Sequence, residues 1–434
     1  MSAFLSEERG NPNKAVVKAI ERHFSLHKSI LTMKKLQSLL FFLCFLISGM
    51  LMLVSCKGTT TDSKANMPEG SSAESLGQHS FSVIDSSTKL AYEGATYALT
   101  TTPLVGNPTK QYASTFVPGA EELGQDEIRV TILGSGDPFV KSGQASASIL
   151  IEVGNKEKDM FFFDLGSGAL GNFTGLKLPL NSGSKVFLTH LHADHVGDMP
   201  GLVWSLAKSG RKVPVELWGP AGATKELGTL SYANHLMLAH AWDTESLKEH
   251  PNRTGAQIIA TEVPYDKPTK IYERNGVIIS SFPVKHIIDG AVGFRLDYNG
   301  RSIVYSGDTS PCDSVQTACE GGVDLLIHET FPTVETFAKK ASVPTEHARI
   351  VVNHSHTSPG MVGEIFKKAG ARMSVMFHLA VDHETVGPAY REMREQYDGP
   401  VTIAQDLTVF NITKEAVAVR QAIIDPVAWP VVKK

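Results

Sequence analysis

The stretch that decides the fold is residues 189–195, which read Thr-His-Leu-His-Ala-Asp-His. It follows directly on the apolar run 186–188, which is typical of a short buried strand. Three imidazoles and one carboxylate thus lie within six residues on a loop at a strand end. Both groups are ligands that zinc and similar divalent ions accept in proteins. The pattern therefore predicts a metal centre rather than a chance group of surface histidines.

Strand-like and helix-like segments alternate on both sides of this motif. Apolar runs typical of strands lie at residues 128–133, 148–153, 160–163, 185–189, 215–218, 277–282, 293–296, 302–305, 325–327 and 374–377. Helical spacing of apolar residues occurs at 202–209, 226–241, 345–352, 360–369 and 388–396. Because the two kinds of segment interleave without repeats, we expect a single layered α/β domain.

The motif and three later segments resemble the metallo-β-lactamase superfamily over about residues 127–412. The later segments are Ser-Phe-Pro-Val-Lys-His at 281–286, Tyr-Ser-Gly-Asp-Thr at 305–309 and Met-Phe-His at 376–378. The resemblance implies a four-layer αββα sandwich with two Zn²⁺ ions in a cleft at the sheet edges, Mn²⁺ or Fe²⁺ being alternatives. It implies a first metal site of His190, His192 and His286, a second of Asp194, His195 and His378, and Asp308 as the bridge between them.

Further segments are similar to the ribonuclease Z and arylsulfatase-like branch of that superfamily. They are Leu-Gly-Ser-Gly-Asp-Pro at 133–138, Leu-Ile-His-Glu-Thr-Phe at 326–331 and His-Ser-His-Thr-Ser at 354–358. Segments 378–385, 397–401 and 425–430 resemble more narrowly the guanitoxin-biosynthesis-type hydrolases of this fold. The resemblance implies that Asp164, His328 and Glu329 support the ligands from behind. It also implies that Asp194 positions the attacking hydroxide and that His356 protonates or contacts the leaving group.

The N-terminal part reads as an export signal. Met-Lys-Lys at 33–35 precedes the nearly continuous apolar run 36–54, which ends in Leu-Val-Ser-Cys at 53–56. This resembles a bacterial lipoprotein signal in which Cys56 is lipidated, and Met33 is an alternative start. A transmembrane anchor, which needs about 20 apolar residues, is the competing interpretation. We therefore expect a leader at 1–55, a tether and wrapping segment at 56–125, the hydrolase domain at 126–412 and a tail at 413–434.

The net charge bears on the binding partners, and the cysteine content bears on disulfide formation. Without the first 55 residues, 34 Lys and Arg face 42 Asp and Glu, a formal charge of −8, which disfavours nucleic acid as a partner. Beyond the leader and Cys56, the sequence contains only Cys312 and Cys319. In an oxidising compartment these two can form a disulfide, and two free thiols are the alternative.

Together these features predict a metal-dependent hydrolase of the bacterial cell envelope. We expect it to be held to the membrane by a lipid anchor, to face the periplasm or the exterior, and to cleave a sulfate or phosphate ester in a small molecule. The alternatives are hydrolysis of a lactone, amide or β-lactam, a ribonuclease Z-like phosphodiesterase, and a non-catalytic binding protein on the same fold. The sequence leaves the oligomeric state open.

Overall fold

The structure is a computed structural model that describes residues 89–92 and 95–431. The leader, Cys56 and most of the expected tether lie outside the described residues. Within the described part, no helix is both long and apolar enough to cross a bilayer.

Within the described residues, the first of two large sheets has ten strands. Its order is β10-β9-β8-β7-β6-β5-β18-β19-β3, and β4 also pairs with β19. The strands are β3 (Leu104–Gly106), β4 (Thr115–Phe116), β5 (Ile128–Gly134), β6 (Ser148–Val153), β7 (Met160–Phe163), β8 (Lys185–Phe187), β9 (Val215–Pro220), β10 (Ile258–Val263), β18 (Thr408–Ile412) and β19 (Ala416–Ala422).

The second large sheet has seven strands in the described residues, in the order β11-β12-β13-β14-β15-β16-β17. They are β11 (Thr269–Arg274), β12 (Val277–Pro283), β13 (Val292–Tyr298), β14 (Arg301–Tyr305), β15 (Leu325–Glu329), β16 (Met373–Phe377) and β17 (Val401–Ile403). A separate two-stranded ribbon pairs β1 (Lys89–Tyr92) with β2 (Ala95–Ala98).

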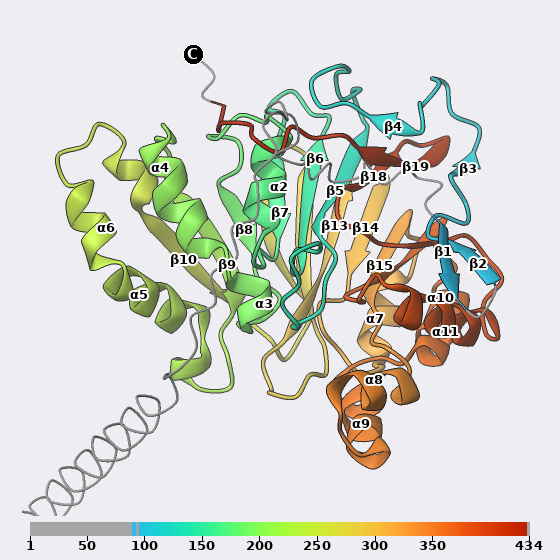
Figure 1. The fold of residues 1–434 in the computed structure, drawn as a ribbon. Helices are drawn as coiled ribbons and strands as arrows, with labels where there is room; N and C mark the ends of the chain where they lie inside the picture. Colours follow the sequence, from blue (N-terminus) through green and yellow to red (C-terminus); the bar gives the residue numbers. More distant parts are fainter. Residues whose placement is uncertain (1–88, 93–94, 432–434) are drawn as a thin grey trace, which may run out of the picture. The chain divides into compact units, whose positions relative to one another are not determined.

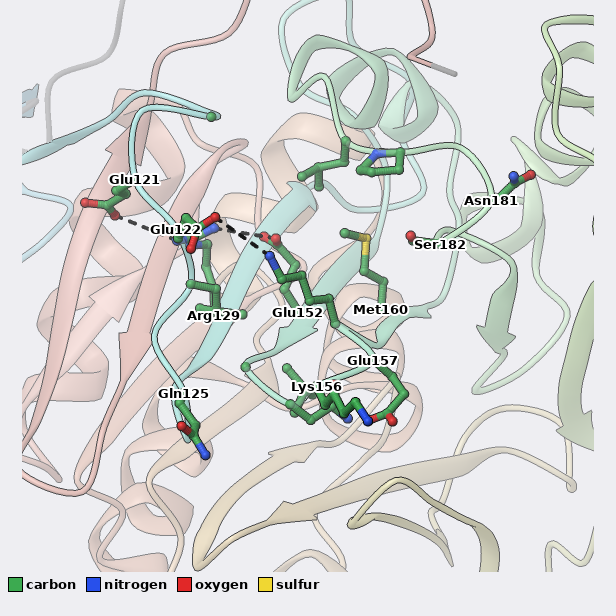
Figure 2. A pocket seen from close by; sticks show the side chains of 18 of the residues that line it. Glu121, Glu122, Gln125, Arg129, Glu152, Lys156, Glu157, Met160, Asn181 and Ser182 are labelled. Atoms are coloured by element: carbon green, nitrogen blue, oxygen red, sulfur yellow. Dashed lines mark hydrogen bonds and ion pairs between the residues drawn. The ribbon is translucent and has the colours of Figure 1, made fainter. Parts of the chain in front are cut away.

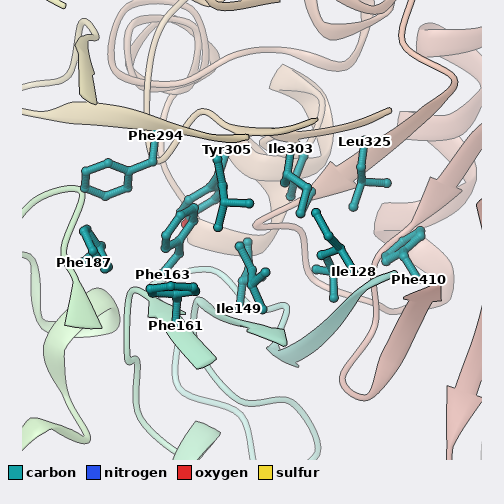
Figure 3. Packing of buried hydrophobic residues seen from close by; sticks show 14 of the residues in the cluster. Ile128, Ile149, Phe161, Phe163, Phe187, Phe294, Ile303, Tyr305, Leu325 and Phe410 are labelled. Carbon is teal, nitrogen blue, oxygen red and sulfur yellow. The ribbon is translucent and has the colours of Figure 1, made fainter. Parts of the chain in front are cut away.

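The main core lies between the two large sheets. Alternate residues of each strand point to it, as the two-residue period of a strand requires: Ile128, Val130 and Ile132 of β5 meet Ile303 and Tyr305 of β14 in one buried cluster. Figure 3 shows aliphatic and aromatic side chains of the two sheets facing one another. The rings of Phe163 and Phe294 belong to opposite sheets, and their centres lie 5.2 Å apart. This packing holds the two sheets face to face.

Helices cover both outer faces (Figure 1). Near the first sheet lie α2 (Ala169–Gly175), α3 (Ala193–Val196), α4 (Leu206–Lys208), α5 (Thr229–Ala239) and α6 (Ala241–Ser246). On the side of the second sheet lie α7 (Asp313–Cys319), α8 (Val334–Ala341), α9 (Thr345–Ile350), α10 (Pro359–Ala369) and α11 (His383–Arg394). The opposite faces of the same strands pack against most of these helices in two further apolar clusters, whereas α8 and α9 pack on each other in a small cluster of their own. The architecture is the four-layer αββα sandwich that the sequence predicts.

The large sheet extends beyond the range expected for the hydrolase domain. Residues 413–434 were expected to form a tail, yet β19 pairs along its length with β18, and every residue of β19 is buried. β3 and β4, within the expected wrapping segment, pair with β19 in turn. The alternating Ala and Val residues of β19 are too small to mark it as a strand in isolation, but they fit a sheet position covered on both faces.

The two cysteines of the domain are free thiols in the structure, which is the second of the two alternatives that the sequence left open. Cys312 is the residue before the first turn of α7, and Cys319 is its last residue. At 1.5 Å of rise per residue, seven residues of helix separate their Cα atoms by roughly 10 Å. A disulfide needs Cα atoms within about 7 Å of each other.

Asp406 anchors the loop that leads from β5 to β6 beside the sheet edge. Its carboxylate accepts hydrogen bonds from the backbone N–H of Ser135 (2.9 Å), the hydroxyl of Ser135 (2.8 Å) and the backbone N–H of Ala145 (2.7 Å). Both ends of the loop are therefore tied to one side chain that follows β17.

Replacing Asp406 with alanine should lower the free energy of unfolding by about 2–4 kcal/mol, because two backbone donors lose their acceptor at a buried place. Urea unfolding followed by circular dichroism measures the change. Asp425→Ala is the control, because Asp425 pairs with Lys177 at the surface and its removal should have little effect. Equal losses in the two variants would contradict the anchoring role of Asp406.

Candidate metal centre

The predicted metal ligands come together because several strands end at the same edge of the sandwich. β14, β15 and β16 are parallel neighbours, and β12 runs in the same direction because it is antiparallel to β13, which is antiparallel to β14. His286 follows β12, Asp308 follows β14 and His378 follows β16. The loop after β8 and the short helix α3 bring in the 189–195 motif from the first sheet.

Three imidazoles and one carboxylate form the first group. Nδ1 of His192 lies 2.9 Å from Nε2 of His190 and 3.2 Å from Nε2 of His286. Oδ2 of Asp308 lies 3.9 Å from Nε2 of both His190 and His286. Three nitrogens bound to one zinc ion at 2.0–2.1 Å in tetrahedral geometry lie about 3.3 Å apart. The spacing of the three rings fits a single divalent ion.

The second group is fully buried and shares Asp308 with the first. Nε2 of His195 lies 3.4 Å from Asp194 Oδ2 and 3.3 Å from Asp308 Oδ1. Nε2 of His378 lies 3.1 Å from Asp194 and 3.5 Å from Asp308 Oδ2. In each group the potential ligand atoms all lie within 4.8 Å of one another. All seven residues that the sequence predicted as ligands are thus in two groups joined by Asp308.

The electrostatics of the centre fit bound cations. Nε2 of His195 and Oδ1 of Asp308 are buried and have no hydrogen-bond partner in the described structure. Burial opposes ionisation of Asp308, but His378 and His195 hold the pKa of its carboxyl well below its usual range. Burial, followed by the neighbouring His195, lowers the pKa of His190 well below the usual value, so this ring is neutral and free to donate a lone pair. Polar atoms left unpaired at such depth are costly without a ligand.

Asp164 supports the centre from behind. It follows β7 and accepts hydrogen bonds from Nδ1 of His195 (2.8 Å) and from the backbone N–H (2.7 Å) and hydroxyl (2.8 Å) of Thr189. The hydroxyl of Tyr305, which comes from the other sheet, donates to the same carboxylate over 2.8 Å. The bond to Nδ1 orients His195 so that Nε2 faces the centre, as partners of metal-binding histidines generally do. His286 is oriented in the same way by donating from Nδ1 to the backbone oxygen of Ser355 (2.8 Å).

Sequence reasoning missed the parts played by Tyr305 and Thr189, although both stand in motifs that it quoted. Tyr305 occupies an inward position of β14, where the other side chains are apolar. A tyrosine hydroxyl at such a position needs a buried hydrogen-bond partner. This need is the signal in the sequence from which the role of Tyr305 could have been predicted.

Two turns of unusual backbone conformation place the ligands. Gly307 has φ +58°, and a Cβ there would come within 2.7 Å of the Thr189 side chain, so the turn before Asp308 packs directly on the 189–195 loop. His378 itself has φ +61°, a conformation that side chains other than glycine seldom adopt. Such strained residues gather at functional sites, where the surrounding packing holds them.

His356 and Glu329 form a hydrogen-bonded pair next to the second group. Nδ1 of His356 lies 3.1 Å from Oε1 of Glu329, and that oxygen also accepts from the backbone N–H of Thr309 over 2.8 Å. The ring of His356 stacks on Phe331, with centres 4.1 Å apart and planes at 7°. Its centre is 5.3 Å from that of His286 and 5.7 Å from that of His378. His356 is thus fixed at the border of both groups.

His328 does not take the place that the sequence predicted. Neighbouring residues of a strand point to opposite faces, so Glu329 of β15 faces the centre while His328 points away from it. Nδ1 of His328 donates to the backbone oxygen of Glu329 (2.7 Å), and among the described residues its ring makes no hydrogen bond or ion pair with a ligand candidate. His328 therefore does not hold the ligands in this structure.

A wide cavity lies away from the metal centre. It measures about 820 Å³ and is lined by residues of β5, β6 and the segments around them, none of them a ligand candidate. Figure 2 shows Arg129 between two carboxylates. Its Nη1 lies 3.5 Å from Glu152 and its Nη2 lies 3.8 Å from Glu121. The guanidinium is also stacked over the ring of Phe116 at 4.4 Å. These contacts hold the 104–125 segment on the sheet.

The comparisons with known proteins agree with this geometry. The profile of the Beta-lactamase superfamily domain matches residues 173–379. Ribonuclease Z of Mycobacterium avium is 30% identical over 263 residues, which are 58% of this chain and 85% of that protein. The chain belongs to the metallo-β-lactamase superfamily, and it is a hydrolase.

Two further proteins are similar to parts of this chain. Ribonuclease Z of Methanosarcina acetivorans is 28% identical over 320 residues, 66% of this chain and 98% of that protein. The crystal structure of the metallo-β-lactamase fold protein YhfI from Bacillus subtilis aligns with a TM-score of 0.48 and 20% identity, covering 66% of this chain and 100% of that one. The narrower resemblance to guanitoxin-type hydrolases stays a prediction.

Proposed function

We propose that this chain is a dinuclear metal-dependent phosphodiesterase. The observation that carries the proposal is the Glu329 and His356 pair, a fixed proton donor next to two groups of converging metal ligands. Its relatives named ribonuclease Z favour a phosphodiester over the sulfate ester that the sequence suggested first. Zinc is the metal we propose, because three imidazoles with a carboxylate form a typical zinc ligand set.

Each residue of the centre has a separate role in the proposed hydrolysis. Two divalent ions held by the two ligand groups that share Asp308 would supply hydroxide at neutral pH and would withdraw charge from the scissile bond. Asp194, between His195 and His378, positions the attacking oxygen by accepting its hydrogen bond. As the new bond to phosphorus forms, the bond from phosphorus to the leaving oxygen breaks. His356 donates its proton to that oxygen, and Glu329 holds the ring in place through its Nδ1.

The test is a panel of substrates offered to the metal-loaded protein. It contains bis(4-nitrophenyl) phosphate, 4-nitrophenyl sulfate, an aryl lactone, a cephalosporin and a precursor transfer RNA, with metal content measured on the same samples. We expect the diester to be hydrolysed fastest. Preference for the sulfate or the lactone would replace the proposed substrate class, and no turnover of any compound by protein that holds two metals would favour a binding protein.

Nucleic acid remains an outcome of this panel rather than the proposed substrate. The name of the relatives conflicts with the expectation that no nucleic acid is bound. The charge of −8 on residues 56–434 nevertheless disfavours a long polyanion, because such partners are held mainly by Lys and Arg contacts to phosphates. A small phosphodiester satisfies both observations.

We also propose that the protein is a lipoprotein of the cell envelope, a proposal that rests on residues 33–56 alone. Cys56→Ser should release the protein from the membrane fraction or leave its precursor uncleaved, because a diacylated cysteine contributes two chains to anchoring. Cell fractionation and intact mass measure this. Cys44→Ser, within the leader, is the control and should change nothing. A wild-type protein retained in the membrane with its leader uncleaved would point to a transmembrane anchor instead.

A further inference from the structure

A second, smaller cavity opens directly beside the first group of ligands. It measures about 130 Å³ and is bounded by the metal-ligand candidates His190, His192 and His286. Its other walls come from the 189–195 loop, from the end of β9 with the turn that follows it, and from the loop after β12. They are largely apolar: Leu191, Pro220, Leu227, Ile288 and Ala291. An apolar cavity of about 150 Å³ is large enough to hold benzene.

The charges of this cavity are unusual for a site that takes a phosphate ester. Apart from the ligand histidines, the only ionisable side chain among its described lining residues is the carboxylate of Asp289. Neither lysine nor arginine is among these lining residues. A nucleotide chain extending into this space would bring further phosphates toward a carboxylate with no cation to meet them. Its walls favour an uncharged apolar group.

The position of the cavity relative to His356 indicates which part of the substrate enters it. Neither His356 nor Glu329 lines it, and neither do Asp194 and His378 of the second group. The leaving oxygen has to lie near His356, which protonates it. The cavity therefore receives the substituent that stays on phosphorus after the leaving group has departed.

We propose that the cavity between Leu227 and Ile288 selects phosphodiesters whose retained substituent is a small aryl or branched alkyl group. This proposal rests on the proposed phosphodiesterase function and deepens it by naming the substrate class. Ile288 determines this selectivity through contact with the substituent, and the metal centre acts on the phosphate whatever the substituent is.

Two neighbouring isoleucines allow a matched test. Ile288 lines the cavity and is 49% exposed, whereas Ile287 is 67% exposed and does not line it. The substrates are phenyl 4-nitrophenyl phosphate and methyl 4-nitrophenyl phosphate, which share their leaving group and differ only in the retained substituent. Thymidine 5′-(4-nitrophenyl) phosphate is the third substrate and represents a nucleotide.

We expect wild-type protein to prefer the phenyl over the methyl ester by at least about tenfold in kcat/KM, the usual worth of filling an apolar pocket. Ile288→Ser should lose that preference by lowering kcat/KM for the phenyl ester alone, and Ile287→Ser should keep it. Equal preference in wild type and Ile288→Ser, or a nucleotide ester preferred over the phenyl ester, would overturn the proposal.

A binding measurement separates this proposal from the proposed function. Phenylphosphonate and methylphosphonate are titrated calorimetrically into zinc-loaded wild type and both variants. Tighter binding of phenylphosphonate by about tenfold, lost only in Ile288→Ser, supports the cavity even if no diester is hydrolysed. Equal affinities of the two phosphonates for the wild type would contradict the proposed selectivity of the cavity. The proposal of diester hydrolysis would be unaffected, because the substrate panel tests it separately.

Discussion

Replacing His192 with alanine is expected to remove metal and activity together. Nδ1 of His192 lies within 3.2 Å of the donor nitrogens of both His190 and His286, so its loss opens the first group on one side. Metal content, measured by plasma mass spectrometry, should fall from near two equivalents to one or fewer. Turnover should drop by at least about 100-fold, since even the loss of a partner behind a ligand costs 10- to 100-fold.

The fold of this variant should survive, because the sheets pack on a core that His192 does not enter. His235→Ala is the matched control, since its side chain is exposed and its ring bonds to Ser231 one turn earlier in α5. Well-folded wild-type protein that takes up no metal from excess zinc would contradict the assignment of the whole centre.

Replacing His356 with alanine should leave metal content intact and lower kcat by a factor on the order of 10² to 10⁴, the usual contribution of a positioned general acid. The loss should be small for diesters of 4-nitrophenol and large for diesters of an aliphatic alcohol, because only a poor leaving group needs the proton. Steady-state kinetics on the two substrates measure the difference.

His354→Ala is the control for this experiment. His354 is exposed and lies two residues away at the end of the π-helical turn η4 (Val351–Ser355), so its removal should leave kcat unchanged. Equal losses for good and poor leaving groups in His356→Ala would point to charge stabilisation instead of proton transfer. Loss of metal would show that His356 is itself a ligand.

The candidate ligands could be predicted from the sequence because each stands in a short motif at the end of an apolar run. Such runs become strands wherever both faces are buried, and the ends of parallel strands meet at one edge. The strand at 302–305, for example, is observed as β14, and Asp308 follows it as expected. Local sequence patterns were sufficient to predict the ligands because these residues lie in loops that directly follow strands.

The differences from the expected structure arose from a helix cap, from a neighbouring strand and from the two-residue period of a strand. A helix was expected at 388–396, but α11 begins at His383, because Asp382 caps it by accepting from the backbone N–H of Glu384 and Thr385. The 416–422 segment becomes a strand only because β18 offers it a free edge. His328 was paired with Glu329 from their adjacency in the motif, although the period of a strand places the two on opposite faces.

The hydrogen bonds of Asp164 show that the metal centre depends on the packing of the two sheets. One carboxylate holds a ligand histidine of the first sheet and the hydroxyl of Tyr305 from the second, at a place with no access to solvent. These bonds exist only after the two sheets have closed on each other. Because both sheets supply the ligands, the metal centre exists only in the folded chain. Metal bound there would therefore stabilise the folded state over the unfolded one, so the supply of metal and the stability of the protein are linked.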